Sequence, residues 1–148
     1  MDAIDVLKQD HRRVEELFSK FLETDSELTQ EDLFQQIQTE LTAHAEAEER
    51  VFYPAIREHG SGAIEQALQD HARVKELLME ILTADLDEDG FESRFTELMQ
   101  DVRSHVEEEE GPGGIMEMAR QNLDDVTLRR MVEDIRTVKE SIEDDMAA

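Results

Sequence analysis

The sequence predicts an all-α protein, an up-down-up-down antiparallel four-helix bundle with an additional C-terminal helix. Apolar residues recur at three- and four-residue spacing along most of the chain, which is the period of one helix face. Only two prolines and six glycines interrupt the 148 residues. Hydrophobic residues make up 39% and charged residues 36% of the chain, a balance typical of amphipathic helices packed around one core.

The arrangement of the helices follows from an internal duplication. Asp10-His11 in the first half matches Asp70-His71 sixty residues later, and the His-x-x-x-Glu pair that begins at His44 returns at His105, sixty-one residues later. Two copies of one helical hairpin explain both offsets. Each hairpin therefore supplies one lone histidine and one His-x-x-x-Glu pair.

The first hairpin has clear start and stop signals. Its first helix begins after Asp2, a residue type that caps helix N-termini, and ends in the polar stretch 24–29. His11 lies on the inward stripe of this helix among apolar residues. The second helix is predicted over 31–58, because the segment 59–62, with two glycines, stops the pattern there.

The second hairpin repeats this arrangement. A third helix is predicted over 63–84, an acidic turn over 85–90 and a fourth helix over 91–110, where a glycine- and proline-rich segment breaks the pattern. A fifth helix begins near Asp124-Asp125. Its apolar stripe either packs on the outside of the bundle or pairs with another subunit, and we favour packing on the bundle.

The ligand-type residues of both hairpins fall on the apolar helix faces. A histidine and a glutamate four positions apart share one face of an α-helix, and counting 1.5 Å per residue from the turns places the four histidines at one height. Burying such groups is costly unless a cation compensates their charge. The sequence therefore predicts a metal site. Its predicted ligands are His11, His44, Glu48, His71, His105 and Glu109.

The number and type of these ligands favour a pair of metal ions. Four imidazoles and two carboxylates exceed what one tetrahedral zinc ion takes, and a carboxylate can bridge two ions. Mixed nitrogen and oxygen ligands fit non-haem iron best, with manganese or zinc as alternatives. His59 is expected to stay outside the site, because it lies about 16 Å along the helix from Glu48.

Charge and cysteine content exclude several other functions. The net charge of −24 argues against nucleic-acid and anionic-membrane partners, since both require a basic surface. Without cysteine the chain has no disulfide, thiolate zinc site or cysteine-ligated iron–sulfur cluster. No apolar run approaches membrane-spanning length, and the N-terminus lacks a signal-peptide pattern, so we expect a cytoplasmic protein.

These motifs resemble those of the hemerythrin-like family of HHE cation-binding domains. The resemblance rests on His11, on His44-x-x-x-Glu48 followed by Phe52-Tyr53-Pro54, on His71 and on His105-x-x-x-Glu109. It covers residues 1–120 and leaves 121–148 as a C-terminal helical extension, packed on the bundle or used for association. The resemblance implies two iron ions joined by an oxo or hydroxo bridge, with the four histidines as terminal ligands and the two glutamates as bridging carboxylates.

Two departures from the oxygen carriers of that family bear on function. Lys75 stands where those proteins have a further histidine, which leaves more coordination positions for water or peroxide and favours redox chemistry or sensing over reversible oxygen carriage. Glu110, five residues after His105, competes with Glu109 for the bridging role. We favour Glu109, because it shares the helix face of His105 and matches Glu48 in the duplication.

Residues beside the predicted ligands are open to several interpretations. Glu15 and Lys75 occupy equivalent positions in the two hairpins, and they either pair, approach the metals or remain in solvent. Tyr53 is predicted to pack away from the ligand stripe. Gly113 and Gly114 align with Phe52 and Tyr53, which predicts an opening for small molecules beside the centre.

The sequence thus predicts a non-haem di-iron protein that binds or reacts with dioxygen, hydrogen peroxide or nitric oxide. A catalase-like or other di-iron redox activity is the enzymatic candidate. The alternative is an iron or oxygen sensor, or an oxygen-storage protein without turnover. We expect a monomer or a weak homodimer.

Overall fold

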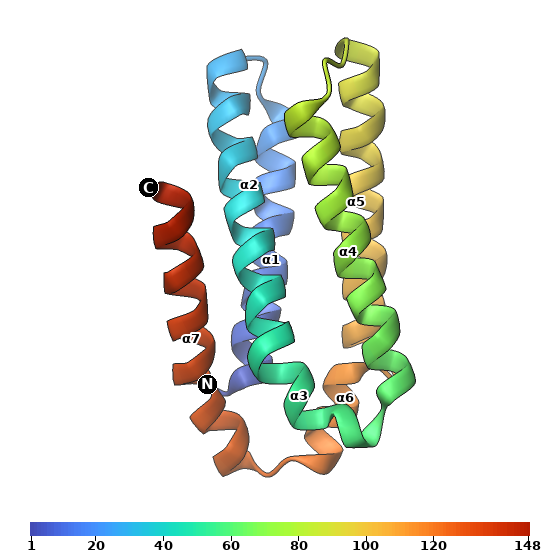
Figure 1. The fold of residues 1–148 in the computed structure, drawn as a ribbon, viewed down its shortest axis with the longest axis vertical. Helices are drawn as coiled ribbons and strands as arrows, with labels where there is room; N and C mark the ends of the chain where they lie inside the picture. Colours follow the sequence, from blue (N-terminus) through green and yellow to red (C-terminus); the bar gives the residue numbers. More distant parts are fainter.

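The computed structural model describes residues 1–148, and every regular element in it is a helix. The four long helices of the bundle are α1 (Ala3–Glu23), α2 (Glu27–Ala47), α4 (Ser61–Thr83) and α5 (Glu88–Glu110). They run alternately up and down, which confirms the predicted antiparallel bundle (Figure 1). The short helices α3 (Tyr53–Ile56) and α6 (Ile115–Asn122) lie at its lower end, and α7 (Asp125–Ala147) is the additional helix.

Polar caps fix where the bundle helices start. Asp2 and Asp5 form a reciprocal capping box at the start of α1, each side chain accepting the other's backbone N–H at 3.0 Å. Ser26 accepts a hydrogen bond from the N–H of Thr29 at 3.3 Å, so α2 begins at Glu27 rather than near residue 31. The predicted start of α5 is wrong by three residues for the same reason, because an aspartate caps it earlier.

The continuous helix predicted over 31–58 is interrupted below α2. A π-helical turn, η1 (Glu48–Phe52), leads into α3 and then into the 3₁₀ turn η2 (Arg57–His59). Tyr53 donates its backbone N–H to the carbonyl oxygen of Glu48, which is the i→i+5 bond of a π-helix. Pro54 favours the interruption, because it has no N–H to donate to the carbonyl four residues earlier. From Tyr53 onward, different side chains therefore face the interior.

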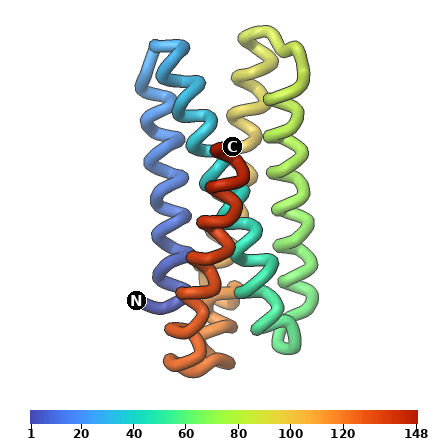
Figure 2. Tube along the Cα trace, turned by 60° about the vertical axis from the view of Figure 1, so that its left-hand side comes forward, coloured from blue at the N-terminus to red at the C-terminus, as the bar shows by residue number.

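The chain after α5 forms two helices where the sequence predicted one. The side chain of Asp124 accepts the N–H of Thr127 at 2.7 Å, and α7 begins at Asp125 as expected. The eight-residue helix α6 was not predicted, and Leu123, with an extended backbone, separates it from α7. α7 then runs back along α1 and α2, on the side of the bundle away from α4 and α5 (Figure 2).

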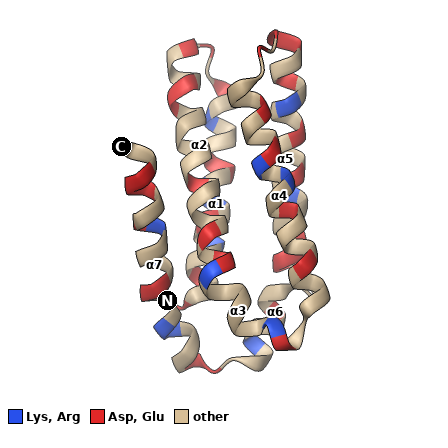
Figure 3. Ribbon diagram, in the orientation of Figure 1, with Lys and Arg blue, Asp and Glu red and all other residues tan.

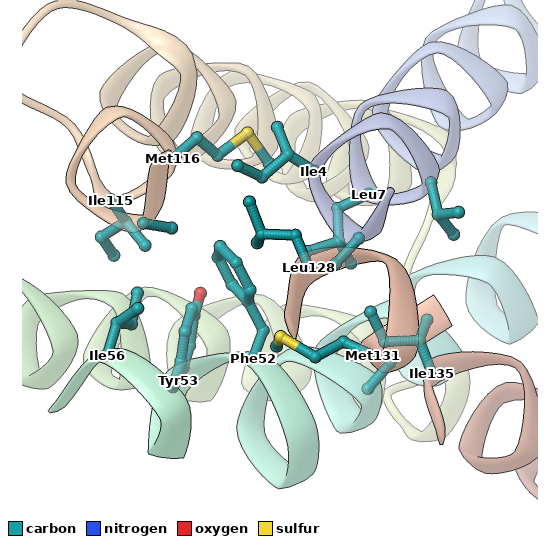
Figure 4. Close-up of a cluster of buried hydrophobic side chains, with 14 of the residues drawn as sticks. Ile4, Leu7, Phe52, Tyr53, Ile56, Ile115, Met116, Leu128, Met131 and Ile135 are labelled. Atoms are coloured by element: carbon teal, nitrogen blue, oxygen red, sulfur yellow. The ribbon is translucent and has the colours of Figure 1, made fainter. Parts of the chain in front are cut away.

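Two apolar cores fill the two ends of the bundle. The lower core joins the start of α1 to η1, α3, α4, α6 and α7 (Figure 4). The upper core lies between the four long helices and is rich in phenylalanine, with the rings of Phe21 and Phe95 stacked at 4.2 Å between centroids. Buried histidines and glutamates occupy the layer between these cores. The apolar cores thus hold the polar layer from above and below.

Acidic residues are spread along all the long helices, with fewer basic ones between them (Figure 3), and most of these charged residues are exposed. The chain carries 39 acidic and 15 basic residues, so its surface attracts cations. None of the helices combines the length and the apolar character needed to cross a lipid bilayer.

Candidate metal centre

Four histidines and two glutamates meet in the layer between the two cores. The helices α1, α2, α4 and α5 contribute one histidine each, and the glutamates come from η1 and α5. The residues brought together are the six predicted ones, His11, His44, Glu48, His71, His105 and Glu109. The two glutamates are 0% and 1% exposed, so neither carboxylate reaches water. His59, at the end of η2, lies outside this layer, as predicted.

The six residues form two groups that share both glutamates. One group contains the histidines of α1 and α2, the other contains those of α4 and α5, and both contain Glu48 and Glu109. Within each group the candidate ligand atoms all lie within 4.8 Å of one another. Two cations in the two groups would each have two imidazoles of their own and would share two carboxylates.

Each glutamate reaches histidines of both groups. Oε1 of Glu48 lies 3.1 Å from Nε2 of His44 and 3.1 Å from Nε2 of the α4 histidine. Glu109 uses its two oxygens separately, because Oε1 lies 3.4 Å from Nε2 of His11 and Oε2 lies 3.2 Å from Nε2 of His105. A carboxylate that turns one oxygen toward each group has the arrangement needed to bridge two cations.

Aspartates hold the outer nitrogens of the α2 and α5 histidines. Nδ1 of His44 donates to Oδ2 of Asp10 at 2.9 Å, and Nδ1 of His105 donates to Oδ2 of Asp70 at 3.0 Å. An ionised carboxylate only accepts hydrogen bonds, so this contact places the proton on Nδ1 and leaves the Nε2 lone pair turned inward. Metal-binding histidines are usually oriented in this way, by a hydrogen bond from the second ring nitrogen to a carboxylate or another acceptor.

Glutamates do the same for the two lone histidines. Nδ1 of His11 donates to Glu110 at 2.5 Å, and Nδ1 of His71 donates to Glu49 at 3.0 Å. Each of these glutamates directly follows a shared glutamate in the sequence. Glu110 therefore lies outside the layer, against the outer nitrogen of His11, while Glu109 lies within it. All four carboxylate partners belong to the duplicated motifs, but the sequence analysis assigned none of them this role.

Three buried atoms in the layer have no hydrogen-bond partner. They are Oε2 of Glu48, Oε1 of Glu109 and Nε2 of His105. Buried polar atoms are rarely left unpaired, and an unpaired one destabilises the fold. All three belong to predicted ligands, and both atom types coordinate divalent and trivalent cations. The residues present thus fit a metal site.

The electrostatics of the layer also call for a cation. Burial alone would lower the pKa of His44, but the charge of Glu48 and the hydrogen bond to Asp10 outweigh it and raise that pKa to about 10. Burial is likewise outweighed at His105, where the nearby carboxylates of Glu109 and Glu48 raise the pKa to about 11. Without metal, the carboxylates of the layer therefore favour protonated imidazoles. A bound cation would replace these protons.

Tyr53 also belongs to the layer, and the prediction that it packs elsewhere is wrong. Its hydroxyl lies 2.5 Å from Oε2 of Glu109, 3.1 Å from Oε1 of Glu48 and 3.3 Å from Nε2 of His71. In a regular α-helix a residue five positions after Glu48 would point about 140° away from it. The π turn η1 removes this rotation and stacks Tyr53 against Glu48. The proline after Tyr53 was the available signal.

A cleft of about 240 Å³ reaches the layer from the side, between the two hairpins. The four histidines lie in its wall together with Lys75 and with leucine and valine side chains of the long helices. A second cavity, of about 160 Å³, is lined by His105, Glu109, Gly113 and Gly114, where the sequence predicted an opening. A side chain at Gly114 would collide with the carbonyl oxygens at the end of α5. Both cavities give small molecules access to the layer.

Glu15 takes no part in the centre. Its carboxylate accepts two hydrogen bonds from the guanidinium of Arg103, at 2.6 and 3.0 Å, on the exposed surface between α1 and α5. Of the interpretations open for Glu15, the structure therefore supports a surface ion pair. Lys75, its equivalent in the second hairpin, lies at the cleft instead.

The sequence model of the hemerythrin HHE cation-binding domain matches residues 2–112. The chain belongs to this family. The hemerythrin HHE domain is a cation-binding domain, and the histidine–glutamate layer described above is the candidate metal site of this chain. The matched residues include all six predicted ligands and end just after α5.

Relatives of this hemerythrin HHE domain differ in length and in name. This chain is 30% identical to a DNA nickase of Nostoc sp. over 144 residues. It is 27% identical over 110 residues to an uncharacterized hemerythrin-like protein of Schizosaccharomyces pombe. The aligned regions cover 97% and 72% of this chain, but 40% and 54% of those proteins. The chain therefore spans about half or less of the length of these relatives.

A solved structure shares the fold. The crystal structure of a hemerythrin HHE cation-binding domain-containing protein from Mycobacterium kansasii superposes with a TM-score of 0.77, at 21% sequence identity. The match covers 98% of this chain and 89% of the other, so it includes the helices that follow the bundle.

Proposed function

We propose that this hemerythrin HHE domain holds two iron ions and that the pair binds or reacts with small oxidants, namely dioxygen, hydrogen peroxide or nitric oxide. One observation carries the proposal. Two groups of ligand atoms share the carboxylates of Glu48 and Glu109, and each group has two histidines of its own. Such sharing serves a pair of ions and would be wasted on one.

The donor set favours iron over the other candidates. Imidazole nitrogens with carboxylate oxygens suit iron, whereas a tetrahedral zinc site would be complete with four donors and leave the rest unused. Manganese accepts similar donors and is the closest competitor. The hydroxyl of Tyr53, which lies among the same atoms, is a further oxygen donor for one of the ions. When bound, the iron pair supplies the oxidation–reduction chemistry that no side chain of this protein can provide.

The chain's own residues hold, orient and protect this pair. Four carboxylates outside the layer fix the imidazole rings through Nδ1, so that each Nε2 is ready to bind without reorganisation. Tyr53 stays protonated in the absence of metal, because burial, and then the charges of Glu48 and Glu109, raise the pKa of its hydroxyl. Its hydroxyl oxygen lies 2.5 Å from Oε2 of Glu109, so the phenol holds a proton inside the layer that it can donate.

The cleft between the hairpins is the entry route that we assign to the oxidant. Its volume of about 240 Å³ leaves room for diatomic molecules and peroxide beside the histidines. Its wall combines apolar side chains with Lys75, in the position where a further histidine would occupy a coordination place. Peroxide decomposition therefore fits this chain better than reversible oxygen carriage.

Two other functions remain candidates. A sensor or oxygen-storage protein without turnover would use the same ligands, and its signal would pass through a partner rather than a product. The Nostoc relative is named a DNA nickase, which makes DNA cleavage a candidate as well. The net charge of −24 opposes binding to a phosphate backbone, so we favour the oxidant chemistry.

Metal analysis with optical spectroscopy tests the proposal. Protein loaded with ferrous iron under argon and then exposed to air should retain about two iron atoms per chain and develop near-ultraviolet charge-transfer bands, which change on addition of peroxide. Binding of one ion or none would refute the iron pair. If two ions bind but the optical spectrum does not change with peroxide and no oxygen is evolved, the result would instead favour storage or sensing.

A further inference from the structure

One lysine of α7 contacts an aspartate that orients a predicted metal ligand. Nζ of Lys139 lies 2.5 Å from Oδ1 of Asp10, and the other oxygen of Asp10 accepts from Nδ1 of His44 at 2.9 Å. The side chains of Lys139 and Asp10 are 17% and 8% exposed, so the ammonium and the carboxylate meet largely away from water. A continuous chain of contacts thus runs from the C-terminal helix to the outer nitrogen of a predicted ligand.

The sequence of α7 directs Lys139 to this point. The buried residues of α7, Leu128, Met131, Val132 and Ile135, follow three- and four-residue spacing. Lys139 comes four residues after Ile135 and continues the same face. The inward stripe of α7 therefore ends in a cation, and that cation meets the only aspartate among the core-facing residues of α1.

The second half of the duplication lacks this contact. Asp70 holds His105 as Asp10 holds His44, but the side chain of Asp70 is 25% exposed. Its free oxygen accepts only the neutral amide of Gln66, at 3.0 Å. α7 covers α1 and α2 and leaves α4 and α5 uncovered (Figure 2). Two halves that match in their ligands thus differ in the charge beside the orienting aspartate.

We propose that Lys139 is a positioning residue of the metal centre, which holds the carboxylate of Asp10 in the orientation that contacts His44 and so makes the two metal positions unequal. The inference rests on the proposed pair of ions. A carboxylate as buried as Asp10 is costly without a counter-charge, so after loss of the ammonium it turns toward water. This turn weakens its hold on the Nδ1 proton of His44 and frees the ring to rotate. The position formed by the α1 and α2 histidines then binds its ion less tightly, while the other position is unaffected.

Anaerobic titration with ferrous iron tests the inference on the full chain. Wild-type protein should bind two equivalents. In Lys139→Met, one equivalent should bind about tenfold more weakly, within the range known for loss of outer contacts to metal ligands. Lys139→Arg, which keeps a cation able to reach the carboxylate, should restore the wild-type curve. Wild-type binding of both equivalents by Lys139→Met would overturn the inference, whereas fewer than two equivalents in the wild type would overturn the proposed function instead.

Proton NMR of the ferrous protein separates positioning from general destabilisation. The four ligand histidines should give four exchangeable Nδ1–H signals shifted by the metal. In Lys139→Met one of the four should move or exchange faster. The matched control is Arg120→Met, which removes an ion pair of α6 with Asp2 at 2.9 Å, far from the ligands. This control should lower stability and leave all four signals in place. A uniform change of the four signals in Lys139→Met, or the same change in Arg120→Met, would show a merely structural role.

Discussion

The hydroxyl of Tyr53 lies 2.5 Å from Oε2 of Glu109, a residue 56 positions away in the sequence. The contact joins η1 to the last turn of α5 and brings a phenol into a layer of buried carboxylates and imidazoles. Burial and the two glutamate charges both disfavour the phenolate, so the pKa of Tyr53 is raised from its ordinary value.

The chain's single tyrosine and lack of tryptophan make this shift directly measurable. Metal-free folded protein should show no phenolate absorbance one pH unit above the ordinary pKa of 10.0, whereas urea-unfolded protein should titrate near that value. Tyr53→Phe should show no such absorbance in either state, as the control. An ordinary titration curve in the folded protein would place the hydroxyl in water.

Loss of a predicted ligand should lower metal occupancy. His44→Ala and His105→Ala each remove one imidazole from a different group, so each should lose about one of two iron atoms, as counted by metal analysis after removal of free ion. His59→Ala is the control, because His59 lies at the end of η2 and belongs to neither group. Iron loss in the His59 variant would contradict the geometry of the layer.

Metal-free protein should lose stability as pH rises. The pKa values of His44 and His105 are raised to about 10 and about 11, above the ordinary 6.5 that they have when unfolded. Protonation therefore stabilises the folded state fully below pH 6.5, and this contribution declines until about pH 10 for His44 and about pH 11 for His105. The Tm of the metal-free form should fall over that window, while the Tm of the iron-loaded form should be higher and nearly constant. Parallel curves for the two forms would mean that metal does not replace these protons.

Much of this site could be predicted because it depends on regular geometry. A rise of 1.5 Å per residue and four helices of similar length are enough to bring His11, His44, His71 and His105 to one height. The contacts of Tyr53 could not be predicted in this way, since a π turn changes the register by one residue. Whether a π turn forms at this point depends on whether burial of Tyr53 is favourable in the tertiary structure.

Contacts between elements far apart in the chain also could not be predicted from the sequence. Lys139 and Asp10 are 129 residues apart, and they meet only because α7 folds back along α1. The spacing places each of the two residues on the buried face of its helix, but it does not indicate that these two faces pack together. The break between α6 and α7 at Leu123 was missed for a related reason, because the apolar pattern continues on both sides of it.

α7 should be part of the folding unit rather than an independent tail. Ile135 is fully buried in the lower core beside residues of α1 and η1, so Ile135→Ala should lower the free energy of unfolding by about 2–5 kcal/mol in urea titrations. Val126→Ala, on the same helix at a position 49% exposed, should change it by less than about 0.5 kcal/mol. Equal, small effects of both changes would indicate that α7 serves association instead.

The position of Lys75 allows a direct test of peroxide chemistry against oxygen carriage. Lys75 follows His71 by one helical turn and lies in the wall of the cleft that reaches the layer. Lys75→His should add an imidazole at that point and occupy a coordination place that peroxide would otherwise use. Oxygen evolution from peroxide should therefore slow, and the reduced protein should form a longer-lived dioxygen complex in stopped-flow spectra.

Lys75→Gln serves as the control for this comparison, because it removes the charge without adding a metal ligand. If the histidine acts as a ligand, the glutamine variant should keep the wild-type peroxide rate while the histidine variant loses most of it. Equal slowing in both variants would mean that the charge of Lys75 matters and not the open coordination place. A wild-type protein that releases dioxygen reversibly and leaves peroxide intact would return this domain to the oxygen carriers, since its open positions would then serve binding alone.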